Sequence, residues 1–340
     1  MGAQTSGMVC GHHHLYSTLA RGMPAPPSTP TTFGEILEQI WWRLDAALDL
    51  DMLRASARLG AMEAVLSGTT AIIDHHESPN AIEGSLDVIA EACADVGVRV
   101  ITAYGVTDRH GGDGARRGLV ENERFIRAGG AGMVGVHAAF TCRDDTLAAA
   151  AGLAADLGVG VHIHVAEGPE DHAAGDRLVG LARPDWLLVH CVGLERDLPG
   201  TIAHNPRSNM NNHVGYARPA ARPNAIVLGT DGIGADMLEE FRLAYVAHRA
   251  DDVTAVPDTA WSWLETGYRY FPDARHDRVT WSYDHADSPW HVAFTPGTRV
   301  AEVIRADGEA LVTDGRPVRV DAAEVRAHAA EQAARLFSRL

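Results

Sequence analysis

Lysine is absent from this sequence of 340 residues, so all 29 of its basic residues are arginine. This absence excludes a Schiff-base mechanism, a lysine general base and a Walker-type phosphate loop, because each of them needs a lysine amine. Any chemistry that the protein performs must therefore rest on other side chains.

Cysteines are also few, and no long apolar run is present. Cys10, Cys93, Cys142 and Cys191 lie far apart with no CxxC pair, which is typical of reduced cytoplasmic thiols. No segment approaches the roughly 18 consecutive apolar residues of a membrane span, and no basic-then-apolar signal region is seen. The net charge of −16 argues against nucleic acid or an anionic membrane as a partner. We expect a cytoplasmic protein with neither nucleic acid nor membrane as a partner.

Short runs rich in β-branched residues alternate with segments of helical periodicity. This alternation is typical of βα units and a parallel sheet. The helical segments include 81–96, 144–157 and 235–250, and Gly158 is a typical helix stop. Eight such runs predict an α/β fold of the (β/α)8 TIM-like barrel type, with strands at 8–12, 69–74, 99–105, 133–137, 160–165, 186–191, 200–204 and 225–231.

The connection after the first strand, residues 15–68, is too long for a single βα unit. It contains a proline-rich loop (22–33) and the paired aromatics Trp41 and Trp42. Long loops at the carboxyl ends of barrel strands usually serve the active site. The two tryptophans therefore either roof a pocket or belong to the core.

Histidines and one acid fall at the ends of four predicted strands. His12 and His14 end the first strand, His164 the fifth, His190 the sixth and Asp231 the eighth. The carboxyl ends of barrel strands meet at one mouth, so these side chains are expected to converge there. Imidazoles together with one carboxylate suit a borderline divalent metal such as zinc or iron, with one position open for water.

The motifs resemble those of the amidohydrolase superfamily. "GHHHLYS" resembles its HxH, "HIHVAEG" its strand-five HxxE, "HCVGL" its strand-six histidine, and "HNPRSN" and "GTDGIGADM" its last two strand signatures. "HHHLYSTLARG" and "WWRLD" are most similar to SsnA-like aminohydrolases within the metal-dependent deaminase branch. The resemblance covers roughly residues 8–250.

The resemblance implies roles for individual residues. One metal ion per chain, zinc with iron or manganese as alternatives, is held by His12, His14, His164 and Asp231. Two-metal relatives use a carboxylated lysine, which this chain lacks. The remaining implied roles are His190 contacting the metal-bound water or substrate, Asp231 accepting the proton of water, Glu167 shuttling protons, and His137 binding substrate.

Other residues in these motifs have weaker assignments. His75 or His76, at the end of the second strand, can line the pocket. Arg207 pairs either with an anionic substrate group or with structural acids. His13 is expected to be a bystander because its side chain alternates away from those of its neighbours.

The two ends of the sequence depart from the family pattern. We expect a barrel domain at 1–285 and a region at 286–340 that holds a reduced remnant of the usual β-sandwich, with strands at 299–306 and 309–314 and a C-terminal helix. The N-terminal half of that sandwich is missing, so these two strands are expected to lack partners. Unpaired strand edges tend to be covered, which predicts a homo-oligomer that buries this region.

The sequence therefore predicts a metal-dependent hydrolase of C–N bonds that deaminates an N-heterocyclic or amidine-like small molecule. Hydrolytic ring opening or amide cleavage would use the same residues. A catalytically inactive barrel that serves as a binding or scaffold subunit is the alternative from another class. These alternatives stay open at the level of sequence.

Overall fold

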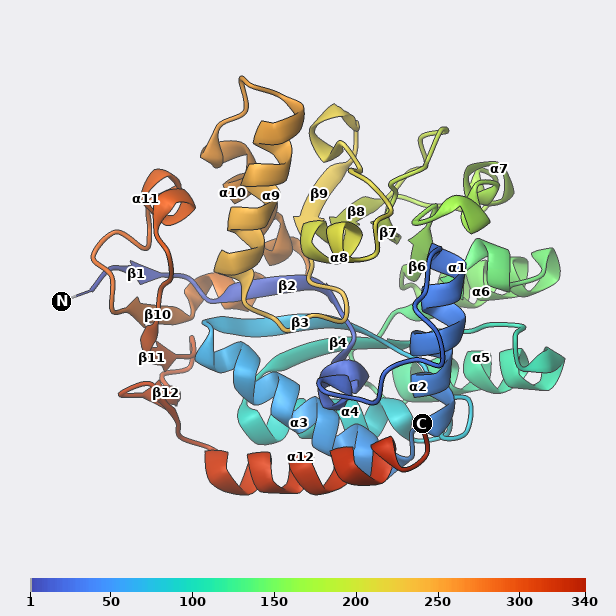
Figure 1. Ribbon diagram of the computed structural model, residues 1–340, viewed down its shortest axis with the longest axis horizontal. Coiled ribbons are helices and arrows are strands. Elements are labelled where there is room, and N and C mark those ends of the chain that lie inside the picture. The colour runs from blue at the N-terminus through green and yellow to red at the C-terminus, as the bar shows by residue number, and fades with distance from the viewer. Residues whose placement is uncertain (1) are drawn as a thin grey trace.

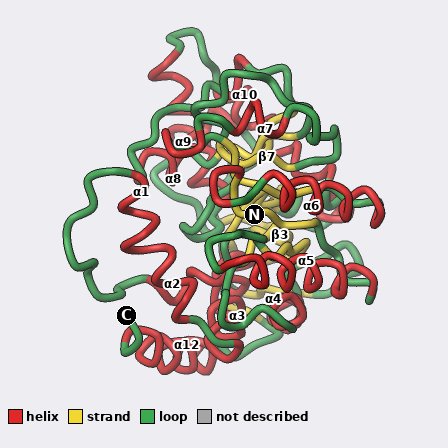
Figure 2. Tube along the Cα trace, turned by 90° about the vertical axis from the view of Figure 1, so that its right-hand side faces the viewer, coloured by secondary structure: helices red, strands yellow, loops and turns green. Residues whose placement is uncertain are grey.

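Parallel strands run through the middle of the computed structural model, which describes residues 2–340, and helices surround them (Figures 1 and 2). Every predicted barrel strand is present close to its predicted range. These strands are β2 (Met8–His13), β3 (Thr69–His76), β4 (Arg99–Tyr104), β5 (Val134–Ala138), β6 (Val161–Val165), β7 (Leu187–His190), β8 (Thr201–His204) and β9 (Ala225–Leu228).

The strands form two parallel sheets that meet at both edges. One sheet has the order β2-β3-β4 and the other β5-β6-β7-β8-β9. Parallel bridges Thr102↔Gly132 and Val106↔Val136 join β4 to the segment of β5, and a third bridge, His13↔Asp231, joins β2 to the segment after β9. The eight strands thus run around a ring, as the (β/α)8 prediction requires.

Helices follow most strands. They are α3 (Leu50–Leu66), α4 (Ser85–Val96), α5 (Gly111–Arg127), α6 (Asp144–Leu157), α7 (Ala174–Leu178), α8 (Pro206–Asn211), α9 (Met237–Asp251) and α10 (Pro257–Glu265). In α6, Asp144 and Asp145 lie in the first turn, where their negative charges interact favourably with the helix dipole. Gly158 ends the helix in the left-handed conformation with φ 68°. The connection from β7 to β8, residues 191–200, has no helix.

The long first connection has several short elements before α3. They are the 3-10 helix η1 (Leu15–Ala20), α1 (Phe33–Ile36), the π-helical turn η2 (Leu37–Trp41) and α2 (Trp42–Ala47). Figure 2 shows the proline-rich loop arching outside the helix that α1 begins. π-helical turns often occur at functional sites, and this one places Leu37 and Trp41 over the barrel mouth.

The barrel interior has an apolar floor. Side chains from nearly every strand form one buried cluster, closed from below by Phe271 and Ala274: Val9, Ala71, Ile73, Ala103, Met133, Leu187, Val189, Ala203 and Val227. Val9, Val189 and Val227 of this cluster precede His12, His190 and Asp231 along the chain. The histidines and acids at the carboxyl ends of the strands therefore lie directly above a packed core.

A separate antiparallel sheet lies beside the barrel, with the order β1-β10-β11-β12-β13. Its strands are β1 (Gln4–Thr5), β10 (Arg278–Trp281), β11 (Val300–Ile304), β12 (Ala310–Thr313) and β13 (Arg316–Pro317). Both predicted strands of the C-terminal region exist, but the expectation that they lack partners is wrong. β11 pairs with β10 on one side and β12 on the other, and β10 pairs with β1.

This sheet begins before the predicted boundary at residue 285 and also uses residues 4–5. Its edges are the two-residue strands β1 and β13, too short to offer a long template for another chain. The structural reason for predicting that association buries this region is therefore lost, and association itself stays a prediction.

Two 3-10 helices and two α-helices complete the C-terminal part: η6 (Thr266–Arg269), η7 (Pro272–His276), α11 (Pro289–Phe294) and α12 (Ala322–Phe337). α12 packs beside α3, at the bottom of Figure 1. Arg335 in α12 and Arg339 just after it both form ion pairs with Asp49, the N-cap residue of α3. Across residues 2–340, none of the helices combines the length and apolarity that crossing a membrane requires.

Candidate metal centre and active site

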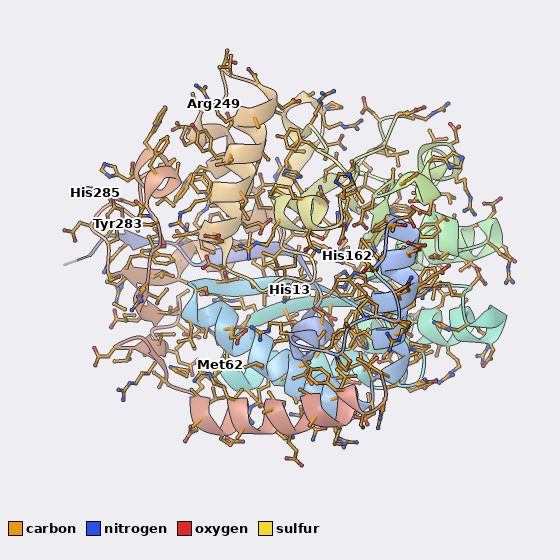
Figure 3. The ribbon with its side chains drawn as sticks, in the orientation of Figure 1. His13, Met62, His162, Arg249, Tyr283 and His285 are labelled. Atoms are coloured by element: carbon orange, nitrogen blue, oxygen red, sulfur yellow. The ribbon has the colours of Figure 1, made fainter. Side chains whose placement is uncertain are left out.

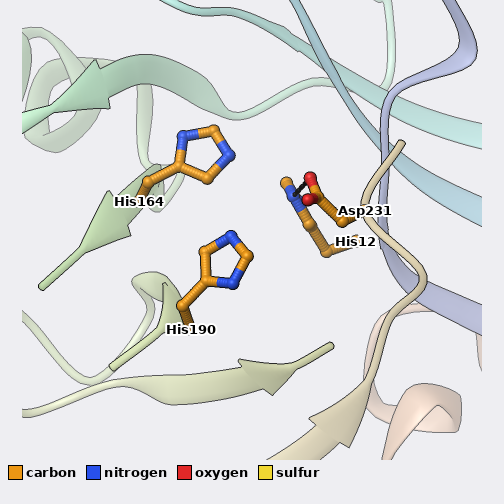
Figure 4. Close-up of side chains that lie close together, drawn as sticks. All are labelled: His12, His164, His190 and Asp231. Atoms are coloured by element: carbon orange, nitrogen blue, oxygen red, sulfur yellow. Dashed lines mark hydrogen bonds and ion pairs between the residues drawn. The ribbon is translucent and has the colours of Figure 1, made fainter. Parts of the chain in front are cut away.

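Four buried side chains converge at the barrel mouth. His12 from β2, His164 from β6, His190 from β7 and Asp231 after β9 each offer one ligand atom, and these atoms all lie within 4.8 Å of one another. Figure 4 shows the three imidazoles and the carboxylate facing a common centre. This is the convergence that the strand-end positions predicted.

His14 lies against the same group. Its Nε2 atom is 2.9 Å from Oδ1 of Asp231 and 3.3 Å from Nε2 of His164. The same carboxylate oxygen is 3.2 Å from Nε2 of His12. The structure thus joins all five residues, and it brings His190 as close to the centre as the predicted ligands. Which four of the five hold a metal stays a prediction.

Nδ1 of each histidine in this group points away from the centre and contacts another residue. In three cases Nδ1 donates a hydrogen bond to an oxygen: His14 to His75 O (2.6 Å), His164 to His137 O (2.6 Å) and His190 to Asn209 Oδ1 (2.7 Å). Nδ1 of His12 instead lies 2.8 Å from Nε2 of His162. Nδ1–H donation leaves the Nε2 lone pair free.

This arrangement fits a metal ion. Second-shell groups that hold Nδ1 are the usual way in which proteins orient histidine ligands. Nε2 of His190 is buried and has no hydrogen-bond partner, an arrangement that is costly unless something else satisfies the atom. A cluster of imidazoles and one carboxylate is therefore suited to a borderline divalent cation.

Asp231 is held as an anion. Burial opposes ionisation, but contacts with His12 and His14 keep the pKa of Asp231 well below its usual range. The Ser208 hydroxyl donates to its other carboxylate oxygen. Asp231 (φ 55°) and His190 (φ 68°) both have left-handed backbone conformations, a strain that is common at functional sites.

Glu167 lies beside the cluster without belonging to it. Its Oε2 atom is 3.4 Å from Nε2 of His190, and Oε1 accepts from Nδ2 of Asn212 at 3.1 Å. Burial, and to a lesser degree the charge of Asp231, raises the pKa of Glu167 to about 6. A carboxyl with a pKa near the working pH can both give and take a proton.

A pocket opens over this site. His14, His164, Glu167 and Asp231 line its inner end, and the aromatic side chains of Tyr16, Phe33, Trp41 and Phe140 line its walls. Of the two tryptophans, Trp41 thus contributes to the pocket. Trp42 instead lies under the guanidinium of Arg109, 4.3 Å from the ring centroid.

Asp45 and Glu77 line another part of the pocket and were not anticipated from the sequence. Both accept from Arg109, which lies between them. Burial raises the pKa of Asp45 to about 6 and that of Glu77 to about 8. The pocket therefore has a second polar region in addition to the histidine cluster.

His137, the predicted substrate-binding residue, lines the pocket, and its Nδ1 pairs with Oγ1 of Thr141 at 2.8 Å. His75 also lines the pocket, whereas Nε2 of His76 is hydrogen-bonded to the Ser78 hydroxyl.

The bystander assignment of His13 agrees with its position, since its Nδ1 pairs with Thr230 outside the cluster. Arg207 forms ion pairs with Glu239 and Glu240, so its structural role is the one that the contacts support.

The sequence analysis missed the residues that hold the cluster in place. His162 precedes His164 by two residues, and this strand periodicity was a signal that both imidazoles point into the barrel. Ser208 and Asn209 lie within the "HNPRSN" motif, but no role was predicted for them, and Asn212 lies beyond it. All three reach the site through the fold of the segment around α8.

Fold and site together define a (β/α)8 protein with a buried histidine–aspartate cluster, suited to a metal ion, at the strand ends. The chain belongs to the amidohydrolase family, whose model it matches over residues 5–266. A 5'-deoxyadenosine deaminase of Methanopyrus kandleri is 32% identical over 276 residues, which cover 72% of this chain and 62% of the relative. A 5-methylthioadenosine/S-adenosylhomocysteine deaminase of Symbiobacterium thermophilum is 30% identical over 266 residues, covering 68% and 57%.

The chain thus spans about three fifths of the length of these two curated relatives. Among solved structures, an adenosine deaminase from Xanthomonas campestris with bound zinc superposes with a TM-score of 0.81 at 21% identity, covering 99% of this chain and 86% of that one. The zinc complex of atrazine chlorohydrolase TrzN from Arthrobacter aurescens gives 0.77 at 21% identity, with coverages of 97% and 88%. These structures share the fold.

Proposed function

We propose that this protein is a metal-dependent aminohydrolase that removes the exocyclic amino group of an N-heterocycle as ammonia. The observation that carries the proposal is the cluster of His12, His14, His164, His190 and Asp231, with their nitrogen and oxygen atoms turned to one centre beside Glu167. Its substrate class is an adenosine-type nucleoside, supported by the deaminases named among its relatives.

In this proposal His12, His14, His164 and Asp231 hold one divalent cation, with zinc as the first choice, and His190 faces the water and substrate. A divalent cation bound there supplies Lewis acidity and lowers the pKa of water toward neutrality. Asp231 is an anion beside the centre of the cluster and accepts the proton that the attacking water gives up.

Glu167 performs the remaining proton transfers. Its carboxyl group protonates a ring nitrogen next to the reacting carbon, which makes that carbon electrophilic. The resulting carboxylate takes the remaining hydroxyl proton of the added water and delivers it to the departing amine, so that ammonia leaves and a carbonyl remains. The proton held by Asp231 then restores the Glu167 carboxyl group. Asn212 orients the carboxyl group by donating to Oε1. Positioned proton transfer of this kind contributes about 10²–10⁴ in rate.

The pocket favours a planar substrate. Phe33, Trp41 and Phe140 present aromatic surface above the cluster, and aromatic rings pack well on such surfaces. Lined in this way, the pocket has both an apolar wall and polar groups that can orient a heterocycle.

Ammonia release tests the proposal. Protein loaded with zinc should release one ammonia per turnover from 5'-deoxyadenosine, 5-methylthioadenosine or adenosine and give the corresponding hypoxanthine nucleoside. Product analysis by mass spectrometry separates this reaction from ring opening, which adds water and releases no ammonia. Failure of all amino-substituted purines, pyrimidines and pterins to release ammonia would contradict the proposal.

A further inference from the structure

His12 differs from the other histidines of the cluster in the group that holds it. A carbonyl or amide oxygen accepts from Nδ1 of His14, His164 and His190. Nδ1 of His12 instead lies 2.8 Å from Nε2 of His162, with the two ring centroids 5.0 Å apart and the rings nearly perpendicular.

His162 is placed for this contact by the pleat of β6. It lies two residues before His164, so both side chains point into the barrel, and it is fully buried in the interior (Figure 3). Its other nitrogen, Nδ1, is buried and has no hydrogen-bond partner. Within residues 2–340, the contact with His12 is therefore the only hydrogen bond that the His162 ring makes.

The direction of this hydrogen bond follows from the chemistry of His12. A neutral imidazole has one donor and one acceptor nitrogen. If Nε2 of His12 is to present its lone pair to a metal ion, Nδ1 must carry the proton. Nε2 of His162 is then the acceptor, and the proton of His162 lies on Nδ1.

We propose that His162 is a positioning residue for the metal centre, whose Nε2 accepts the Nδ1–H of His12 and so fixes Nε2 of His12 toward the cluster. The inference rests on the proposed function, because it assumes that His12 binds a metal. His162 does not contact the reacting atoms. Its effect is on the tautomer and ring orientation of one ligand.

Two substitutions separate this role from simple core packing. His162→Gln keeps an acceptor in the right place, because the glutamine Oε1 atom is the same number of bonds from Cα as Nε2 of histidine. His162→Leu keeps similar volume but has no acceptor. His204→Leu is the control, because His204 on β8 of the same sheet is equally buried and its ring makes no hydrogen bond to the cluster.

The measurement is the affinity of each purified variant for zinc ions alone, by competition with a chromophoric chelator. His162→Leu should bind zinc roughly 10–100-fold more weakly, the usual cost of removing such a partner. His162→Gln and His204→Leu should retain the affinity of the unsubstituted protein. Equal affinity of His162→Leu and the unsubstituted protein would overturn the inference, as would an equal loss in His162→Leu and His162→Gln.

Failure of the proposed function has a different signature. If the zinc affinities follow the expected order but no amino-substituted heterocycle releases ammonia, the reaction is wrong and the role of His162 stands. If ammonia is released and the zinc affinities of the His162 variants are unchanged, the reaction stands and the role of His162 falls. If the unsubstituted protein binds no zinc, both are overturned.

Discussion

Oδ1 of Asp231 lies 3.2 Å from Nε2 of His12, although 219 residues separate the two in the sequence. They belong to the segments that close the barrel, where the backbone N–H groups of Thr230 and Asp231 both donate to the carbonyl of His12. The cluster of candidate metal ligands therefore spans the contact between the first and last strands of the ring. A metal ion bound by these residues should therefore stabilise the contact between the first and last strands.

Metal binding is accordingly expected to stabilise the fold. A ligand present at 100 times its Kd adds about 2.7 kcal/mol to the free energy of unfolding. Thermal denaturation should show a higher Tm with zinc than after chelation. Asp231→Asn is the matched variant, since asparagine tolerates the left-handed backbone at this position but lacks the charge. Its Tm should not respond to zinc, and a response equal to that of the unsubstituted protein would contradict the assignment.

Glu167→Gln should separate catalysis from metal binding. Glutamine keeps the size of the side chain and can still accept from Asn212, but it cannot cycle a proton. Metal content by elemental analysis should stay the same, while kcat for ammonia release falls by about 10²–10⁴. His164→Ala should instead lose metal. Near-full activity of Glu167→Gln would show that another group moves the proton.

Gly232→Ala tests the aromatic wall of the pocket. A Cβ atom at Gly232 would lie only 2.3 Å from Cη2 of Trp41, so the indole has to move. Overpacking of this kind costs about 1–3 kcal/mol of folding free energy, and the displaced indole should raise KM because it no longer fits the substrate. Gly297→Ala, where a Cβ would meet no atom within 4 Å, is the control. An unchanged KM in Gly232→Ala would remove Trp41 from the substrate site.

Glu240 should make the protein less stable as the pH rises. This carboxyl is buried, one of its oxygens has no hydrogen-bond partner, and burial raises its pKa from 4.5 to about 8. Between these two pH values the folded state holds one more proton than the unfolded state, so the free energy of unfolding decreases as the pH increases, by up to about 1.4 kcal/mol per pH unit.

Glu240→Gln imitates the protonated carboxyl and should remove this contribution. Denaturant titrations between pH 5 and 8.5 should show the variant gaining stability over the unsubstituted protein as the pH rises. Parallel curves for the two proteins would mean that Glu240 does not titrate in this range.

The strands and the cluster were predictable because both depend on local patterns. β-branched runs gave each barrel strand, and the positions of His12, His164, His190 and Asp231 at strand ends gave the site, since a closed parallel ring brings such ends together. The small sheet was harder to predict, because Gln4–Thr5 and Arg278–Trp281 are too short to carry a periodic signal. The ion pairs of Arg109 with Asp45 and Glu77 form only through tertiary packing, so no spacing in the sequence predicts them.

The most direct test of a single-metal aminohydrolase is a titration of metal-free protein with zinc while ammonia release from 5'-deoxyadenosine, or the best substrate found, is followed. The chain has one cluster of buried ligands in residues 2–340 and no lysine to bridge two ions. Activity should therefore be negligible without metal, rise linearly with added zinc and level off at one equivalent per chain. Full activity in the metal-free protein, or a rise that continues to two equivalents, would contradict the account.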